Sequence, residues 1–285
     1  MQRISDLQAW RDYAHAQRTQ GRHVGLVPTM GALHQGHASL FRAARSNGDL
    51  VLATVFVNPR QFNDASDLAA YPRTPESDVE MAEHNGVDCF VEPSLHAMWP
   101  DYPDATPTTV SVRGIGDRLE GAGRPGHFDG VASIVAKLFA ITGPCRAYFG
   151  EKDYQQMCVV RQMVRDLAFE VDVVGCPIVR DVDGLAISSR NVLLSAEGRS
   201  RALALSRALA LVGEQPATAS EHRQRLEQCL GEAGVATSYV EVADPVTLAA
   251  SNDDEVGIRR ALVAGVVDNV RLIDNAPVTL RARNS

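Results

Sequence analysis

The chain has 285 residues, of which 45% are hydrophobic and 22% are charged, and its formal net charge is −7. This length allows one large domain or two ordinary ones, and the composition is typical of a soluble globular protein. The acidic balance argues against a protein that binds nucleic acid non-specifically, because phosphate contacts require an excess of basic residues.

No apolar run approaches the roughly 20 residues that a membrane-spanning helix needs, and the N-terminal MQRISD has no apolar signal-peptide core. The five cysteines are scattered and form no C-x-x-C pair. This pattern favours a reducing compartment over a disulfide framework or a zinc site. We therefore expect a cytoplasmic protein with no membrane and no nucleic-acid partner.

The first two-thirds of the chain alternates strand-like and helix-like segments. The pattern predicts strands at residues 23–27, 49–57, 88–91, 146–149 and 171–174. It predicts helices at about residues 35–46, 75–85, 128–141 and 154–167. Such alternation is typical of βαβ units, so we predict a Rossmann-like, doubly wound, mostly parallel α/β sheet. In these sheets, ligands bind at the loops that follow the carboxyl ends of the strands.

The pattern of predicted helices and strands changes after about residue 178. Alanine- and leucine-rich amphipathic helices are predicted at residues 195–212 and 219–233. Strand-like pieces follow at residues 238–242, 260–266 and 270–273. We therefore predict a second, smaller α+β domain at the C-terminus, with residues 1–178 forming the first domain and residues 179–285 the second.

The first candidate loop reads PTMGALHQGH and lies between a predicted strand and a predicted helix. His34 and His37 are three residues apart, so they occupy neighbouring positions at a helix N-terminus, where free N–H groups attract an anion. Gly36 between them is expected to let a ligand approach the backbone closely. Two alternatives remain, namely ordinary capping histidines and a metal site, although no third ligand stands nearby with suitable spacing.

A second loop, FGEKDYQQ, again joins a strand to a helix. Lys152 could bind a phosphate, and Asp153 could accept hydrogen bonds from a ribose or cap the helix. Taken alone, this segment could equally be a solvated charged turn.

Two other segments carry candidate polar groups. In DGLAISSRN, two hydroxyls beside Arg190 suit a phosphate clamp, and Gly184 would give the loop mobility. In VNPRQF, the amides of Asn58 and Gln61 could bind a small polar substrate at the end of a strand. Each segment alone could also be a serine-rich turn or a plain strand end.

Six motifs occur together in one order: PTMGALHQGH, FVNPRQF, YPRTPESD, RPGHFDGV, FGEKDYQQ and DGLAISSRN. In this set the chain resembles the pantothenate synthetase family of pantoate–β-alanine ligases. These belong to the H-x-G-H superfamily of nucleotidyltransferases and class I aminoacyl-tRNA synthetases. The pieces YVEV and RLIDN near the C-terminus extend the match to nearly the whole chain.

The resemblance implies a role for each matching residue. The ATP site would comprise Met30, His34, His37, Gly150, Lys152, Asp153, Ser188, Ser189 and Arg190. Within this set the catalytic groups would be His34, His37, Lys152 and Arg190. Pantoate would be bound by Asn58, Gln61 and Gln156. Asp78 is the nearest match to an aspartate that helps to position Mg²⁺, although Ser77 beside it stands where an acidic residue is common.

The resemblance also implies the reaction. Pantoate would attack the α-phosphate of ATP to give pantoyl adenylate and pyrophosphate, and β-alanine would then displace AMP to form pantothenate. Residues 1–178 would bind ATP and pantoate, residues 179–285 would act as a lid, and the protein would be a homodimer. The alternatives are another nucleotidyltransferase of the superfamily and a non-catalytic nucleotide-binding module.

Overall fold

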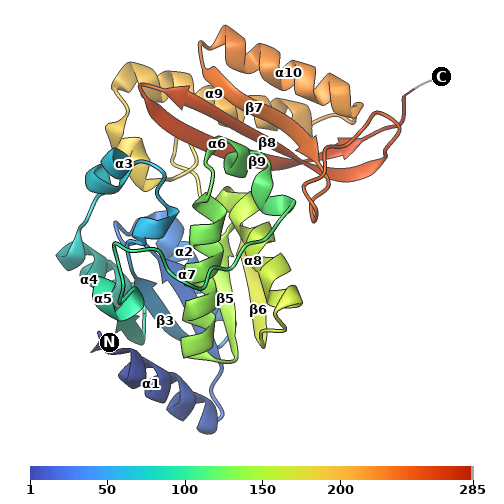
Figure 1. The fold of residues 1–285 in the computed structure, drawn as a ribbon. Coiled ribbons are helices and arrows are strands. Elements are labelled where there is room, and N and C mark those ends of the chain that lie inside the picture. The colour runs from blue at the N-terminus through green and yellow to red at the C-terminus, as the bar shows by residue number, and fades with distance from the viewer. Residues whose placement is uncertain (284–285) are drawn as a thin grey trace. The chain divides into compact units, whose positions relative to one another are not determined.

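The computed structural model describes residues 1–283, which form two compact units (Figure 1). The first unit comprises Met1–Glu151 and Gln155–Pro177. The second comprises Lys152–Tyr154 and the chain from Ile178 onward. The tripeptide Lys152–Tyr154 therefore belongs with the C-terminal unit, although it is far from it in sequence. The division into domains of 1–178 and 179–285 stays a prediction, because compactness does not show that either part folds alone.

The first unit is built on a six-stranded sheet in the order β1-β4-β3-β2-β5-β6, with every neighbouring pair parallel. Its strands are β1 (Gln2–Ile4), β2 (Val24–Thr29), β3 (Leu50–Val55), β4 (Cys89–Val91), β5 (Cys145–Gly150) and β6 (Val171–Cys176). The chain runs outward from β2 to β4 and then returns to place β5 on the other side of β2. This confirms the predicted doubly wound sheet and puts its switch point between β2 and β5, where such sheets bind ligands.

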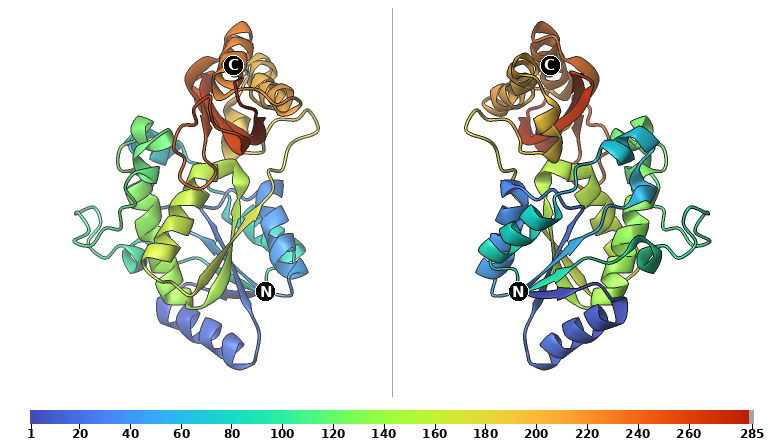
Figure 2. Two further views of the ribbon diagram at one scale, coloured as in Figure 1. Left: turned by 90° about the vertical axis from the view of Figure 1, so that its right-hand side faces the viewer. Right: turned by 90° about the vertical axis from the view of Figure 1, so that its left-hand side faces the viewer.

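Helices cover both faces of this sheet. The helices of this unit are α1 (Leu7–Thr19), α2 (Gln35–Ser46), α3 (Ala65–Ala70), α4 (Pro75–His84), α5 (Leu95–Met98), α6 (Glu120–Gly123), α7 (His127–Thr142) and α8 (Tyr154–Asp166). Figure 2 shows α2 and α4 on one side of the sheet and α1 and α7 on the other. Phe41 of α2 and Phe90 of β4 are fully buried in the core on the α2 side. The central strands read as continuous apolar runs because both of their faces are covered.

The second unit is smaller and contains an antiparallel sheet in the order β7-β8-β9. Its elements are α9 (Ala196–Gly213), α10 (Ala219–Glu232), β7 (Ala236–Ala243), β8 (Gly257–Val267) and β9 (Val270–Leu280). A hydrophobic core between the two helices and one face of the sheet includes Leu209, Leu226 and Val263. The predicted small α+β fold is therefore confirmed. Among residues 1–283, no helix is both long enough and apolar enough to cross a membrane.

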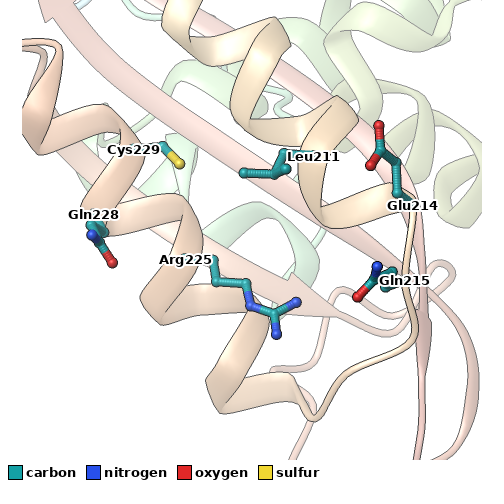
Figure 3. Close-up of a pocket in the computed structure, with 6 residues that line it drawn as sticks. All are labelled: Leu211, Glu214, Gln215, Arg225, Gln228 and Cys229. Atoms are coloured by element: carbon teal, nitrogen blue, oxygen red, sulfur yellow. The ribbon is translucent and has the colours of Figure 1, made fainter.

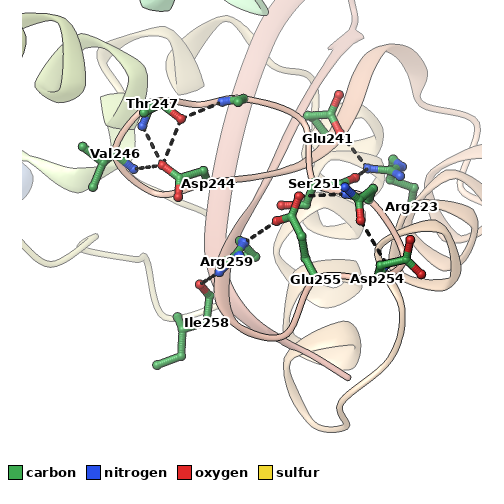
Figure 4. A network of polar contacts seen from close by, with 12 residues as sticks. Arg223, Glu241, Asp244, Val246, Thr247, Ser251, Asp254, Glu255, Ile258 and Arg259 are labelled. Atoms are coloured by element: carbon green, nitrogen blue, oxygen red, sulfur yellow. Dashed lines mark hydrogen bonds and ion pairs between the residues drawn. The ribbon is translucent and has the colours of Figure 1, made fainter. Parts of the chain in front are cut away.

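Polar contacts brace the connection between β7 and β8 (Figure 4). Asp244 accepts hydrogen bonds from the backbone N–H groups of the turn that follows it, at 2.8 and 3.0 Å. Arg259 pairs with Glu255 at 2.9 Å, and Arg223 pairs with Glu241 at 2.9 Å. Ion pairs and an Asp-capped turn hold this connection, with Val246 left exposed on its surface.

Candidate functional site

The loop after β2 presents two histidines at the N-terminus of α2. His34 is the N-cap residue, and its Nδ1 accepts the backbone N–H of Gly36 at 3.1 Å. The Nδ1 of His37 accepts the backbone N–H of His34 at 3.2 Å. The two rings stack with their centroids 4.0 Å apart and their planes at 29°. The helix start thus uses imidazoles for the reciprocal capping that hydroxyl and carboxyl side chains usually provide.

This capping fixes the tautomer of both rings. A backbone N–H can only donate, so each Nδ1 accepts and carries no proton. A neutral imidazole of this kind holds its proton on Nε2. Both histidines are therefore Nε2–H donors at a helix N-terminus, where the free N–H groups and the helix dipole also favour an anion.

The absence of a side chain at Gly36 is also required by the neighbouring imidazole. A Cβ atom at this position would lie 2.8 Å from Cε1 and 2.9 Å from Nδ1 of His34. The missing side chain therefore makes room for the His34 ring itself. That Gly36 also admits a ligand to the backbone stays a prediction.

Asp78 of α4 accepts hydrogen bonds from the backbone of the same loop. Only 2% exposed, its carboxylate accepts the backbone N–H groups of Ala32 at 3.0 Å and Leu33 at 2.7 Å. It also accepts the hydroxyl of Thr74 at 2.9 Å. Gly31, with φ of +80°, allows the turn that brings these N–H groups together. Asp78 thus shapes the histidine loop through both of its carboxylate oxygens, and its role in positioning Mg²⁺ stays a prediction.

The loop after β3 brings Gln61 and Asn58 together. Gln61 is the last residue of the short helix η1 (Pro59–Gln61), and its Nε2 lies 3.0 Å from the sulfur of Met30. The Nδ2 of Asn58 donates to Oε1 of Gln61 at 3.0 Å and to the carbonyl of Gly130 at 3.1 Å. Trp99 Nε1 donates to Oδ1 of Asn58 at 3.0 Å.

These contacts distinguish the two amides. Asn58 is 1% exposed, and the donors and acceptor of its amide are all engaged by the protein. The group that it orients is the amide of Gln61, which it turns so that Nε2 faces Met30. The structure thus brings Met30, Asn58 and Gln61 into one cluster, in which Asn58 positions Gln61.

Helix α7 supports Gln61 through two residues to which the sequence alone assigns no chemistry. The Nδ1 of His127 lies 2.7 Å from the backbone carbonyl oxygen of Gln61. A Cβ atom at Gly130 would clash with the carbonyl of Arg60 and lie 2.8 Å from the Cα of Gln61, so glycine is required for η1 to approach the helix. Both residues lie in the RPGHFDGV motif, so the signal was present in the sequence as a motif without a stated function.

The third loop follows β5. Gly150 ends that strand, and the space where its Cβ would stand is open. Gln156 in the first turn of α8 is partly buried. Its neighbour Gln155, which the motifs did not single out, is 4% exposed and donates to the carbonyls of Ile115 and Arg118 at 2.8 and 2.7 Å. Gln155 therefore anchors the segment before α6, and the role of Gln156 stays a prediction.

Lys152 and Asp153 belong to the second unit. The Nζ of Lys152 lies 3.7 Å from a carboxylate oxygen of Asp153, whose side chain is 50% exposed. The carbonyl of Lys152 accepts a hydrogen bond from Nδ2 of Asn275 at 3.0 Å. The lysine is thus held at its backbone, and its side chain is less exposed, at 21%, than that of Asp153.

The segment that carries Ser188, Ser189 and Arg190 is the last candidate. Ser188 caps the short helix η4 (Ser189–Leu193) by accepting the N–H of Arg190 at 3.3 Å. The turn before it is clamped by Arg199 of α9, which donates to Asp181 at 2.7 Å and to Asp183 at 2.8 Å. The hydrogen bond from this guanidinium holds the pKa of Asp183 below its usual range. Gly184 therefore lies in a turn with fixed ends.

Two other features bear on whether a competing site exists. Within residues 1–283, no group of three or more His, Cys, Asp or Glu side chains is arranged to hold a metal ion. A groove of about 370 Å³ lies between α9 and α10 (Figure 3). It is lined by Leu211, Glu214, Gln215, Arg225, Gln228 and Cys229. It contains none of the predicted residues and a single basic side chain, so it does not resemble a triphosphate site.

The fold and these loops define a class of protein. A doubly wound sheet that places two imidazoles and a helix N-terminus at its switch point is an architecture suited to binding an anionic ligand such as a nucleotide. The family model for pantoate–β-alanine ligase matches residues 2–277. The chain belongs to the pantoate–β-alanine ligase family and is a ligase, which confirms the resemblance seen in the motifs.

Individual relatives agree with this assignment. The chain is 47% identical over 283 residues to the pantothenate synthetase of Paracoccus denitrificans, with 98% of both chains covered. A solved pantothenate synthetase from Thermus thermophilus superposes with a TM-score of 0.88 at 44% identity, covering 97% of this chain and 99% of that one. A pantoate–β-alanine ligase from Francisella tularensis, complexed with β-γ ATP and β-alanine, gives 0.81 at 32% identity, with 97% of both chains covered.

Proposed function

We propose that the protein condenses pantoate with β-alanine in two steps at the candidate site. The carboxylate of pantoate attacks the α-phosphate of ATP, forming pantoyl adenylate and releasing pyrophosphate. The amine of β-alanine then attacks the activated carbonyl and AMP leaves. The observation that carries this proposal is the pair of Nε2–H imidazoles at the start of α2.

The first step gathers negative charge on the α-phosphate and on the departing pyrophosphate. His34 and His37 donate hydrogen bonds to phosphate oxygens, and their fixed tautomers mean that no reorganisation is needed when charge develops. Lys152 and Arg190 add positive charge, while Ser188 and Ser189 donate further hydrogen bonds. A carboxylate is already ionised at neutral pH, so the attack needs positioning rather than a general base.

Pantoate is bound by Gln61 and Gln156, with Asn58 acting behind Gln61. Nε2 of Gln61 is a donor suited to a carboxylate or hydroxyl oxygen, and its Oε1 is engaged by Asn58. Met30, in contact with that amide, offers an apolar surface for the methyl-bearing part of the substrate. Asp153, half exposed beside Lys152, accepts hydrogen bonds from the ribose.

The second unit acts as a lid over the reactive intermediate. Acyl adenylates hydrolyse readily, so closure that excludes water raises the yield of amide. This role is supported by three exposed apolar side chains on the segment that contains Ser188–Arg190. They are Val182, Val192 and Leu193. Apolar side chains gathered on one short segment are suited to burial when the segment closes on a ligand.

Mg²⁺ is proposed to enter as the complex with ATP, and no cluster of three or more His, Cys, Asp or Glu side chains within residues 1–283 is arranged to hold a metal ion by itself. Magnesium commonly keeps several waters and binds through substrate phosphates. Asp78→Asn tests the role of this residue: we expect weaker ATP binding with an unchanged Mg²⁺ concentration for half-maximal rate. A shift of that concentration would instead make Asp78 a ligand.

We also propose that the protein is a homodimer and that it is cytoplasmic. The cytoplasmic location is proposed because the five cysteines are scattered along the sequence and form no C-x-x-C pair, a pattern that favours a reducing compartment. Light scattering after gel filtration measures the oligomeric state, and a mass near the 30.8 kDa of one chain would contradict the dimer.

The decisive experiment measures pyrophosphate exchange into ATP with pantoate alone, and AMP release with pantoate and β-alanine together. Exchange with pantoate and stoichiometric AMP and pantothenate support the two-step reaction. Formation of a nucleotide-linked product without AMP would favour another nucleotidyltransferase. Intact ATP under every condition would favour a nucleotide-binding module.

A further inference from the structure

Two adjacent polar residues in the middle of β9 are almost completely buried. Asp274 is 3% exposed and Asn275 is 2% exposed. Successive residues of a strand point to opposite faces of the sheet. Asp274 pairs in register with Val263, which belongs to the core beneath the helices, whereas Asn275 pairs with Leu262 on the opposite face. Buried polar groups are costly unless they are fully partnered, so their partners indicate why they are present.

Asp274 holds the loop that leads to Ser188. Its two carboxylate oxygens accept two hydrogen bonds from the guanidinium of Arg180, at 2.7 and 3.0 Å. The same guanidinium donates to the carbonyl of Gly184 at 3.2 Å, and Arg180 forms a β-bridge with Ala186. A bidentate pair of this kind fixes both distance and orientation. The turn at residues 181–185 is thereby tied to β9 just before the segment proposed to bind phosphate.

Asn275 holds the other proposed phosphate-binding segment. Its Nδ2 donates to the carbonyl of Lys152 at 3.0 Å, and its Oδ1 accepts from Nε of Arg260 at 2.6 Å. The guanidinium of Arg260 lies over the ring of Tyr154, 4.2 Å from its centroid. The hydroxyl of Tyr154 donates to the carbonyl of Pro245 at 3.1 Å. The turn at Lys152–Tyr154 is therefore fastened to the second unit at both ends.

We propose that Asp274 and Asn275 are positioning residues for ATP, which hold the Lys152 turn and the Ser188–Arg190 loop as a single phosphate-binding element. One strand holds the two segments from its opposite faces, so the cations of Lys152 and Arg190 keep a fixed relation to each other. This inference rests on the proposed function, because it assigns a task to residues that act through Lys152 and Arg190.

The test for Asn275 uses the variant Asn275→Asp, which keeps the acceptor for Arg260 and removes the donor to Lys152. We expect kcat/KM for ATP to fall by at least about tenfold, with kcat falling as well as KM rising. Thr279→Ala changes an exposed side chain on the same strand and should stay within about twofold of the parent. Thermal melting checks that each variant is folded, and Asn275→Ser replaces the aspartate variant if that one is not.

A double-mutant cycle separates positioning from general loss of structure. In a Lys152→Ala background, Asn275→Asp should change kcat/KM and the ATP dissociation constant by less than about twofold, since its target is already gone. Asp274→Asn should behave in the same way in an Arg190→Ala background. Full, multiplicative losses in both cycles would overturn the inference. If the parent protein itself failed to exchange pyrophosphate with pantoate, the proposed function would fall instead.

Discussion

The Nδ1 of His127 lies 2.7 Å from the backbone carbonyl oxygen of Gln61, which precedes it by 66 positions in the chain. A carbonyl oxygen can only accept, so this Nδ1 carries the proton and Nε2 faces the guanidinium of Arg124 at 3.4 Å as an acceptor. The imidazole, 8% exposed, thus links a proposed substrate-binding turn to the first turn of α7. His34 and His37 have the opposite tautomer, although all three histidines belong to one proposed site.

The first prediction concerns this link. His127→Ala removes the donor to Gln61 and loosens the η1 turn, so the KM for pantoate should rise about tenfold, equivalent to ~1.4 kcal/mol of binding. Steady-state kinetics at saturating ATP measures this effect. His15→Ala, at an exposed position on α1, is the matched control and should leave KM unchanged. An unchanged KM for pantoate in both variants would separate His127 from substrate binding.

The second prediction concerns the contact beneath Gln61. Gly130→Ala places a methyl group against the backbone of Arg60 and Gln61, and overpacking of this kind costs about 1–3 kcal/mol. We expect a lower melting temperature together with weaker pantoate binding, because η1 must move away from α7. Gly231→Ala, whose added methyl group would meet no atom within 4 Å, is the control. Equal melting temperatures for the two variants would contradict the packing argument.

The third prediction tests the histidine donors. His37→Ala removes one Nε2–H from the proposed phosphate site, and loss of one such donor typically costs about 10²–10³ in kcat. It also removes the acceptor for the N–H of His34, so a small loss of stability of ~1 kcal/mol is expected in addition. His37→Asn, which can accept that N–H, should recover the stability without recovering the rate. Near-normal turnover by His37→Ala would remove this residue from the mechanism.

The fourth prediction is a pH dependence of stability. Nε2 of His222 in α10 lies 3.1 Å from the carbonyl of Thr279, Nδ1 is buried without a hydrogen-bond partner, and burial lowers the pKa of the imidazole. Because the folded pKa is below the unfolded value, the unfolded chain takes up a proton first as the pH falls. The stability that the neutral ring contributes is complete above about pH 6.5 and is lost as the pH drops toward the folded pKa.

Urea unfolding at about pH 7.5 and about pH 5.5, on either side of the ordinary histidine pKa, measures that loss. His222→Gln keeps an N–H donor in a similar place and does not titrate, so its free energy of unfolding should fall less between these two pH values. Glu221, Arg225 and Arg281, whose charges act on the imidazole, are retained in this comparison. Parallel pH profiles for the parent and the variant would assign the dependence to other groups.

The parts of the fold that the sequence revealed are those with strong periodicity. The helix predicted at residues 35–46 has the bounds of α2, because the apolar spacing and the loop that precedes it are both unambiguous. By contrast, β9 runs to Leu280 although its prediction ended at residue 273. The strand continues because its backbone pairs with β8 as far as Leu280, and Asp274 and Asn275 find buried polar partners within it.

The candidate site was likewise only partly predictable from the sequence. Motifs indicated which residues matter, but chemistry alone could not separate direct binding from support. Asp78 is predicted to help position Mg²⁺ and Asn58 to bind substrate, and the structure adds that both form hydrogen bonds with their own chain. Contacts between residues such as Asn58 and Trp99, which are 41 positions apart, depend on the assembled sheet and leave no local trace in sequence.

The tripeptide Lys152–Tyr154 gives the protein a discontinuous architecture with a practical consequence. A fragment ending at Pro177 would contain the whole parallel sheet, yet Lys152 and Tyr154 would lose the partners supplied by Asn275, Arg260 and Pro245. The complementary C-terminal fragment would in turn lack the aromatic ring that Arg260 covers. Splitting the gene at this junction would therefore yield two pieces, and the C-terminal piece would lack three residues, Lys152–Tyr154, of its own compact unit.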